Sequence, residues 1–157
     1  MDTSSPFPTY IAYSVGYLTD LDLIEWAVGY VPSSEHFADD VDLIELASLN
    51  TKESRCVARA GPLLKSFVTR LWPAFRLDGA KTERYAKLYL KRKLEQYLAE
   101  MCNPNDVCRM VHPIQKVFDF PSWLGSMYDA CNGIEPDAAA TDHGHFVQAV
   151  GETLEAL

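Results

Sequence analysis

Apolar residues recur every three to four positions along almost the whole chain, which is the spacing of one face of an α-helix. The clearest case is the segment 81–101, where Tyr85 and Tyr89 lie one helical turn apart on an apolar face and Lys and Arg fill much of the rest. No segment shows the convincing period-two alternation of a β-strand. The pattern predicts an all-α fold of about seven or eight helices in one compact domain, with stacked helical hairpins as one possible arrangement.

Capping residues locate several helix starts. Thr19 is an expected N-cap with Asp22 three residues later, and Asn103-Pro104 combines a capping residue with proline at the first helical position. Gly61-Pro62 either kinks a helix or starts a new one. The helices are expected at residues 10–17, 19–32, 39–50, 51–72 (kinked or restarted after residue 60), 81–101, 103–118, 120–131 and 145–157, with a loop near 134–144.

Charge is distributed unevenly along this pattern. Residues 1–51 carry nine acidic residues and no Lys or Arg, residues 52–118 hold all 14 basic residues against six acids, and residues 119–157 carry seven acids and no base. These three regions, all expected within the single domain 1–157, can partly neutralise one another on folding. Acidic surface that stays uncovered attracts a cation or a basic protein.

Length and composition set the class of protein. A chain of 157 residues with 48% hydrophobic residues is long enough for one well-buried core, so no cross-link is required. No apolar run reaches the roughly 18 residues of a membrane span. The four cysteines lack C-x-x-C spacing and residues 1–8 lack the features of a signal peptide, which predicts a reduced, cytoplasmic protein with its cysteines in the core. The net charge of −8 disfavours nucleic acid and anionic membranes as main partners.

Candidate catalytic chemistry is sparse. There is no phosphate-binding glycine loop, and the clustered carboxylates stand at helix starts, where capping and the helix dipole hold them ionised. Asp142, His143 and His145 are the one candidate metal set, but their spacing fits no structural zinc site, and a solvated turn is the preferred interpretation. The basic stretch 81–93 leaves a nucleic-acid role open, although its tyrosines fall on the apolar face. We therefore expect no catalytic residues, no metal site and no cofactor, and classify the chain as a non-enzyme.

Three segments resemble stretches of small helical immunity proteins, which protect bacteria against contact-dependent or other polymorphic toxins. They are Gly16–Thr19, Leu23–Ala27 and Phe118–Gly125, the last continuing through Tyr128, Ala130, Cys131 and Glu135-Pro136. Together these segments cover under a quarter of the chain. Immunity proteins have many unrelated folds, so the resemblance implies a class of function and transfers no functional residues.

The function that follows is binding. An acidic surface suits the basic cleft of a nuclease toxin, since charge complementarity steers association and aromatic anchors add contact area. The expected partner is the C-terminal domain of a cognate toxin, with the active site of the toxin covered. Alternatives are a helical adaptor for another basic partner, or a metal-dependent enzyme. The partner-binding residues are expected to be Asp20, Asp22, Glu25, Tyr30, Glu35, Phe37, Asp39, Asp40 and Asp42.

Overall fold

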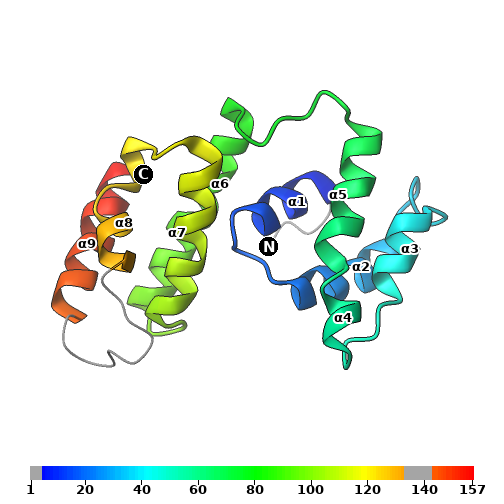
Figure 1. Cartoon of the computed structure of the whole chain (residues 1–157), viewed down its shortest axis with the longest axis horizontal. Coiled ribbons are helices and arrows are strands. Elements are labelled where there is room, and N and C mark those ends of the chain that lie inside the picture. The colour runs from blue at the N-terminus through cyan, green and yellow to red at the C-terminus, as the bar shows by residue number, and fades with distance from the viewer. Residues whose placement is uncertain (1–4, 133–142) are drawn as a thin grey trace. The chain divides into compact units, whose positions relative to one another are not determined.

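The computed structural model describes residues 5–132 and 143–157 (Figure 1). Every regular element in these two ranges is a helix, which confirms the all-α prediction. The helices form two compact units. Unit 1 comprises residues 1–14 and 18–76, and unit 2 comprises residues 15–17 and 77–157. This grouping does not follow the boundaries of the acidic and basic thirds, because each unit takes helices from more than one of them.

Unit 1 is built on the helix α5, against which α1, α2 and α3 pack. Its fully buried side chains come from all four of these helices: Ile11, Leu23, Leu43, Leu46, Leu64 and Phe67. The helices are α1 (Pro6–Ser14), α2 (Asp20–Ser33), α3 (Val41–Ala47), α4 (Ser54–Val57) and α5 (Ala60–Leu71). The expected segment 51–72 is thus two helices, and α5 starts at Ala60 with Pro62 in its first turn, where no backbone donor is needed.

Unit 2 is helical and has its own core. Its helices are α6 (Ala80–Leu98), α7 (Pro104–Phe118), the 3₁₀ turn η1 (Ser122–Leu124), α8 (Met127–Asn132) and α9 (His143–Ala156). Helix α7 packs between α6 and α8, and α9 contacts both α6 and α8. The fully buried side chains include Val15, Leu90, Leu94, Met110, Ile114 and Met127.

Two capping boxes form, of which the box of Thr19 and Asp22 was expected, while Asn103 was expected only as a cap. At the start of α2 the Thr19 hydroxyl accepts a hydrogen bond from the Asp22 amide, and the Asp22 carboxylate accepts one from the Thr19 amide at 2.7 Å. Asn103 and Asp106 make the same pair at the start of α7. Each box satisfies amides that the helix itself leaves unpaired, so these starts are fixed locally.

Some boundaries differ from expectation. The first helix covers Pro6–Ser14 rather than 10–17, because Gly16 has a φ of +75° and Val15 to Tyr17 pass into unit 2. Helix α9 begins at His143, inside the expected loop near 134–144, whose residues 134–142 lie outside the described ranges. Helix α2 includes Pro32 in its last turn and ends at Ser33, one residue after the expected end at residue 32.

Gly16 is required by space as well as by conformation. A Cβ at this position would overlap the backbone carbonyl of Arg109 in α7. The turn therefore brings the chain against α7 at a distance that only glycine allows. The adjacent Tyr17 ring lies 4.9 Å from the ring of Tyr89, and the Lys93 ammonium lies 4.9 Å from the centre of the Tyr17 ring.

One expectation about the cysteines is wrong. Cys108 of α7 and Cys131 of α8 form a disulfide, with their Cα atoms 5.4 Å apart. Cys56 and Cys102 are free and half-buried. The predicted set of four reduced cysteines is thus corrected for one pair. Spacing along the chain gave no indication of this bond, because its partners are 23 residues apart and meet through the packing of α8 on α7.

No helix of the described residues is both long and apolar enough to cross a membrane.

Candidate protein-binding surface

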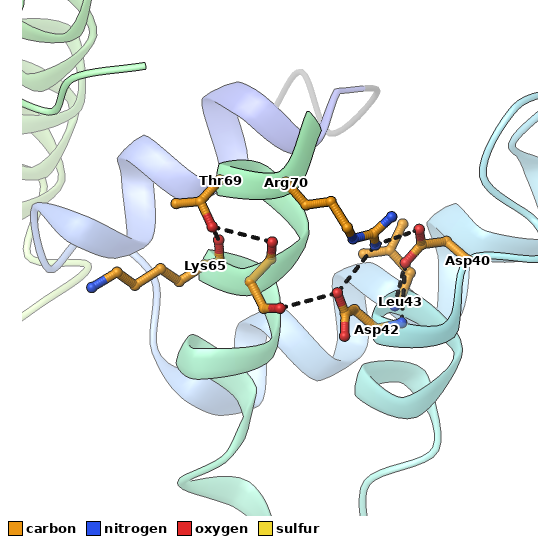
Figure 2. A network of polar contacts seen from close by, with 7 residues as sticks. Asp40, Asp42, Leu43, Lys65, Thr69 and Arg70 are labelled. Atoms are coloured by element: carbon orange, nitrogen blue, oxygen red, sulfur yellow. Dashed lines mark hydrogen bonds and ion pairs between the residues drawn. The ribbon is translucent and has the colours of Figure 1, made fainter. Parts of the chain in front are cut away.

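The expected binding residues all lie in unit 1, and the fold divides them into three groups. The first group pairs with other residues of the same unit. Asp40 caps α3 by accepting hydrogen bonds from the amides of Asp42 and Leu43 at 3.0 and 3.2 Å. Its second oxygen lies 2.7 Å from the guanidinium of Arg70 in α5, which also contacts Asp42 at 3.1 Å (Figure 2).

These contacts set the chemistry of Arg70. The hydrogen bonds that its guanidinium donates to both carboxylates raise the pKa of Arg70. The Ser66 hydroxyl, one turn earlier on α5, donates to Asp42 at 3.2 Å. Asp40 and Asp42 therefore join α3 to α5, and much of their charge is already compensated within the unit.

Asp20 and Asp22 also belong to the first group. Asp22 completes the capping box of α2, and Asp20 accepts a hydrogen bond from the Tyr13 hydroxyl at 3.0 Å. Burial and the neighbouring Asp20 carboxylate raise the pKa of Tyr13 to about 12. The Tyr13 ring also packs so closely on α5 that a Cβ at Gly61 would overlap it. Tyr13 therefore ties α1 to α2 and α5.

The second group consists of three carboxylates that remain on the surface. Glu25 on α2, and Glu35 and Asp39 in the turn before α3, are exposed. Within the described residues none of the three takes part in an ion pair or a side-chain hydrogen bond. Their charge is therefore available to a partner.

The third group is aromatic and partly used inside the unit. The Tyr30 ring stacks on Trp26 with the ring centres 4.8 Å apart, and Phe37 meets the buried Phe67 edge-on at 5.2 Å. Both Tyr30 and Phe37 are half-buried. Each presents one side to solvent from a position that is held by its neighbour, so little side-chain freedom would be lost on binding.

Apolar residues that the sequence analysis did not name accompany these acids. On α2 the side chains of Leu21 and Val28 are 51% and 53% exposed, and on α3 those of Val41 and Ile44 are 74% and 43% exposed. Helix α3 packs directly against α2. A projection of α2 would have found the first two, since Leu21, Glu25 and Val28 fall opposite the buried Leu23 and Ala27.

A shallow hollow of about 560 Å³ lies between α1 and α5. Its lining includes Tyr10, Tyr13, Lys65 and three hydroxyl residues. Each of these hydroxyls donates within unit 1: Ser14 to Tyr10, Ser66 to Asp42, and Thr69 to Lys65. Among the described residues that line the hollow, only Lys65 carries a charge.

The basic helix α6 uses several of its cations within unit 2. Lys87 lies over the Trp123 ring at 5.4 Å and 3.5 Å from Glu83, whose carboxylate accepts the Trp123 indole hydrogen bond at 2.7 Å. Arg92 lies 6.0 Å from the centre of the Tyr89 ring. The two tyrosines expected on the apolar face, Tyr85 and Tyr89, do point inward to different degrees, with Tyr89 buried and Tyr85 half-buried.

The remaining groups are the candidate metal ligands and the two free cysteines. Asp142 and the side chain of His143 lie outside the described residues, and His145 is exposed near the start of α9. Among the described side chains, no group of three or more His, Cys, Asp or Glu could hold a metal ion. A hydrogen bond to Glu53 raises the pKa of the Cys56 thiol, and burial raises that of Cys102, so both thiols stay protonated at neutral pH.

The geometry of unit 1 thus yields a surface on α2, α3 and the turn between them, where exposed carboxylates stand beside exposed aliphatic side chains.

The chain matches no protein-family model, no curated protein and no solved structure with which it was compared.

Proposed function

We propose that this protein is an immunity protein, which binds the C-terminal domain of a cognate bacterial toxin and covers its active site. The observation that carries the proposal is the uncompensated charge of Glu25, Glu35 and Asp39. Residues 1–51 contain no Lys or Arg, and the ion pairs described for their carboxylates join Arg59 to Glu45 and Arg70 to Asp40 and Asp42. The three exposed acids remain as a ready counterpart for cations on a partner.

The proposed partner is a nuclease toxin because its chemistry supplies the opposite charge. A nuclease must hold phosphate groups, so its active site presents Lys and Arg. Carboxylates on the inhibitor speed the encounter with such a site and disfavour partners of the same charge. Exposed aliphatic residues beside the carboxylates would supply the apolar area that slows dissociation.

The cellular compartment in which the protein works is tested separately from its function. Cysteine spacing predicted the cytoplasm, where thiols are kept reduced, whereas a disulfide such as Cys108–Cys131 is typical of oxidising compartments. Alkylation of thiols in intact cells before lysis, followed by mass spectrometry, decides between them. Modified Cys108 and Cys131 would support the cytoplasm, and a protected pair would place the working protein outside it.

The function is tested by co-expression with any candidate toxin whose gene adjoins the gene of this protein. The proposal expects this protein to restore growth and to co-purify with the toxin. A catalytically inactive toxin serves as the binding control, because it allows the complex to be isolated without selection for growth. Growth arrest despite full expression of this protein, together with no complex, would refute the immunity function. A stable complex with a basic protein that is not toxic would instead identify an adaptor.

A further inference from the structure

One face of α2 carries an uninterrupted exposed stripe. Leu21, Glu25, Val28 and Pro32 are spaced by four, three and four residues, and all four are exposed. Residues three and four apart are neighbours on a helix surface, so the stripe is continuous over about 16 Å. The side chains of Leu21 and Val28 are each more than half exposed and stand on either side of the Glu25 carboxylate.

The stripe is not explained by packing within unit 1. Helix α2 buries its other face against the unit through Leu23, Ile24, Trp26 and Ala27. Helix α3, which packs beside α2, adds the exposed Val41 and Ile44. Isolated surface aliphatics are common, but several on adjacent helices are typical of an interaction site.

Glu25 gives the stripe its charge. Its carboxylate is exposed, and within the described residues it takes part in no ion pair or side-chain hydrogen bond. An ionised carboxylate only accepts hydrogen bonds, so a cationic donor such as Arg or Lys complements it.

We infer that this stripe, defined by Leu21, Glu25, Val28 and Pro32, is the docking face for a basic protein. The complementary surface has an Arg or Lys that reaches Glu25, set between apolar side chains that cover Leu21 and Val28. The inference rests on the proposed binding function and assigns its central contacts to α2. It also moves the centre of the interface from the paired Asp40 and Asp42 to the unpaired Glu25.

The test uses the full-length protein and a catalytically inactive form of the toxin that the co-expression experiment identifies, with the dissociation constant measured by titration calorimetry. Leu21→Ala and Val28→Ala should each weaken binding about tenfold, because each removes apolar area from the contact. Glu25→Lys should weaken binding by more than tenfold and should reduce the dependence of affinity on salt.

Matched controls come from α6 in unit 2. Leu98 is 50% exposed, nearly the same as Leu21, so Leu98→Ala controls for the loss of an exposed leucine. Glu95→Lys controls for charge reversal at an exposed helical glutamate. Both controls should bind within twofold of the wild type, and circular dichroism should show an intact helical fold for every variant.

The outcomes separate the docking face from the function. If the wild type binds the toxin and the three α2 variants bind within twofold of it, the docking face is wrong and the immunity function stands. If the wild type forms no complex, both the function and the docking face fall. A loss of affinity that is equal in the α6 controls would also overturn the assignment to α2.

Discussion

Arg70 and Asp40 form an ion pair at 2.7 Å although 30 residues separate them in the chain. The same Asp40 side chain caps α3, so one carboxylate both starts a helix and attaches it to α5. This double role explains why an acidic cluster in the sequence is not the same as an acidic surface in the structure.

The two roles of Asp40 can be separated by substitution. Asp40→Ala should destabilise the protein by about 1 kcal/mol or more, since it removes a helix cap together with the charge. Asp40→Asn keeps a capping oxygen and loses only the pairing with Arg70, so it should cost less. Urea denaturation at low and high salt measures both effects. The cost of Asp40→Asn should shrink in 1 M salt, and an unchanged cost would mean that the ion pair adds no stability.

Tyr13 should make the protein sensitive to alkaline pH. Its pKa is about 12 in the folded state against 10.0 for the ordinary side chain, so the folded state holds its proton more tightly. The stability from this difference is fully present below pH 10 and is lost as the pH rises from about 10 to 12. Tyr13→Phe should cost about 1 kcal/mol at pH 8 through the lost hydrogen bond to Asp20.

The pH dependence distinguishes Tyr13 from other titrating groups. The free energy of unfolding should differ between wild type and Tyr13→Phe by a constant amount below pH 9 and by a shrinking amount above pH 10. A difference that stays constant to pH 11.5 would show that the phenol keeps an ordinary pKa.

The disulfide between Cys108 and Cys131 should contribute to the stability of unit 2. A bond that closes a segment of 23 residues restricts the unfolded chain and is worth about 3 kcal/mol. The double substitution Cys108→Ser with Cys131→Ser should lower the urea midpoint, and reductant should lower it for the wild type but not for the variant. Mass spectrometry after alkylation gives the direct count of free thiols, and four of them in the oxidised protein would contradict the bond.

Two glycines should respond in opposite directions to the same change. Gly16→Ala should destabilise the protein by more than about 1 kcal/mol, because Gly16 has a positive φ and its space is filled by the Arg109 carbonyl. Gly29→Ala should stabilise it by about 0.5 to 1 kcal/mol, because Gly29 lies within α2 with open space around its Cα. The midpoint of thermal unfolding is measured for both variants and for the wild type. Equal shifts of the midpoint in the two variants would contradict the turn assigned to Gly16.

Sequence reasoning succeeded where the interactions span a few residues. The caps Thr19 and Asn103 each bond to a residue three positions later. Helical periodicity also placed Tyr89 of α6 on the buried face, but Leu98 and Met101, which the same periodicity assigns to that face, are exposed. The contacts of Asp40 with Arg70, and of Cys108 with Cys131, depend on how helices pack and leave no local pattern.

The candidate surface shows the same limit. Counting charges identified the first 51 residues as acidic, and this count is independent of the fold. Which acids are neutralised depends on packing, because α5 brings Arg70 to Asp40 and Asp42, whereas no described residue forms an ion pair with Glu25. A helical projection of α2 could have predicted that Leu21 and Val28 are exposed, once the opposite face was known to be buried.

The short segment Val15–Tyr17 belongs to unit 2, while the residues on either side of it belong to unit 1. Neither unit is therefore encoded by one uninterrupted stretch of the gene. A truncation after Arg76 would leave the Tyr17 ring without Tyr89 and Lys93, and a fragment from Leu77 onward would lack Val15 and Tyr17. Recombination could not transplant either unit into another protein with a single crossover, so the two units would be inherited together.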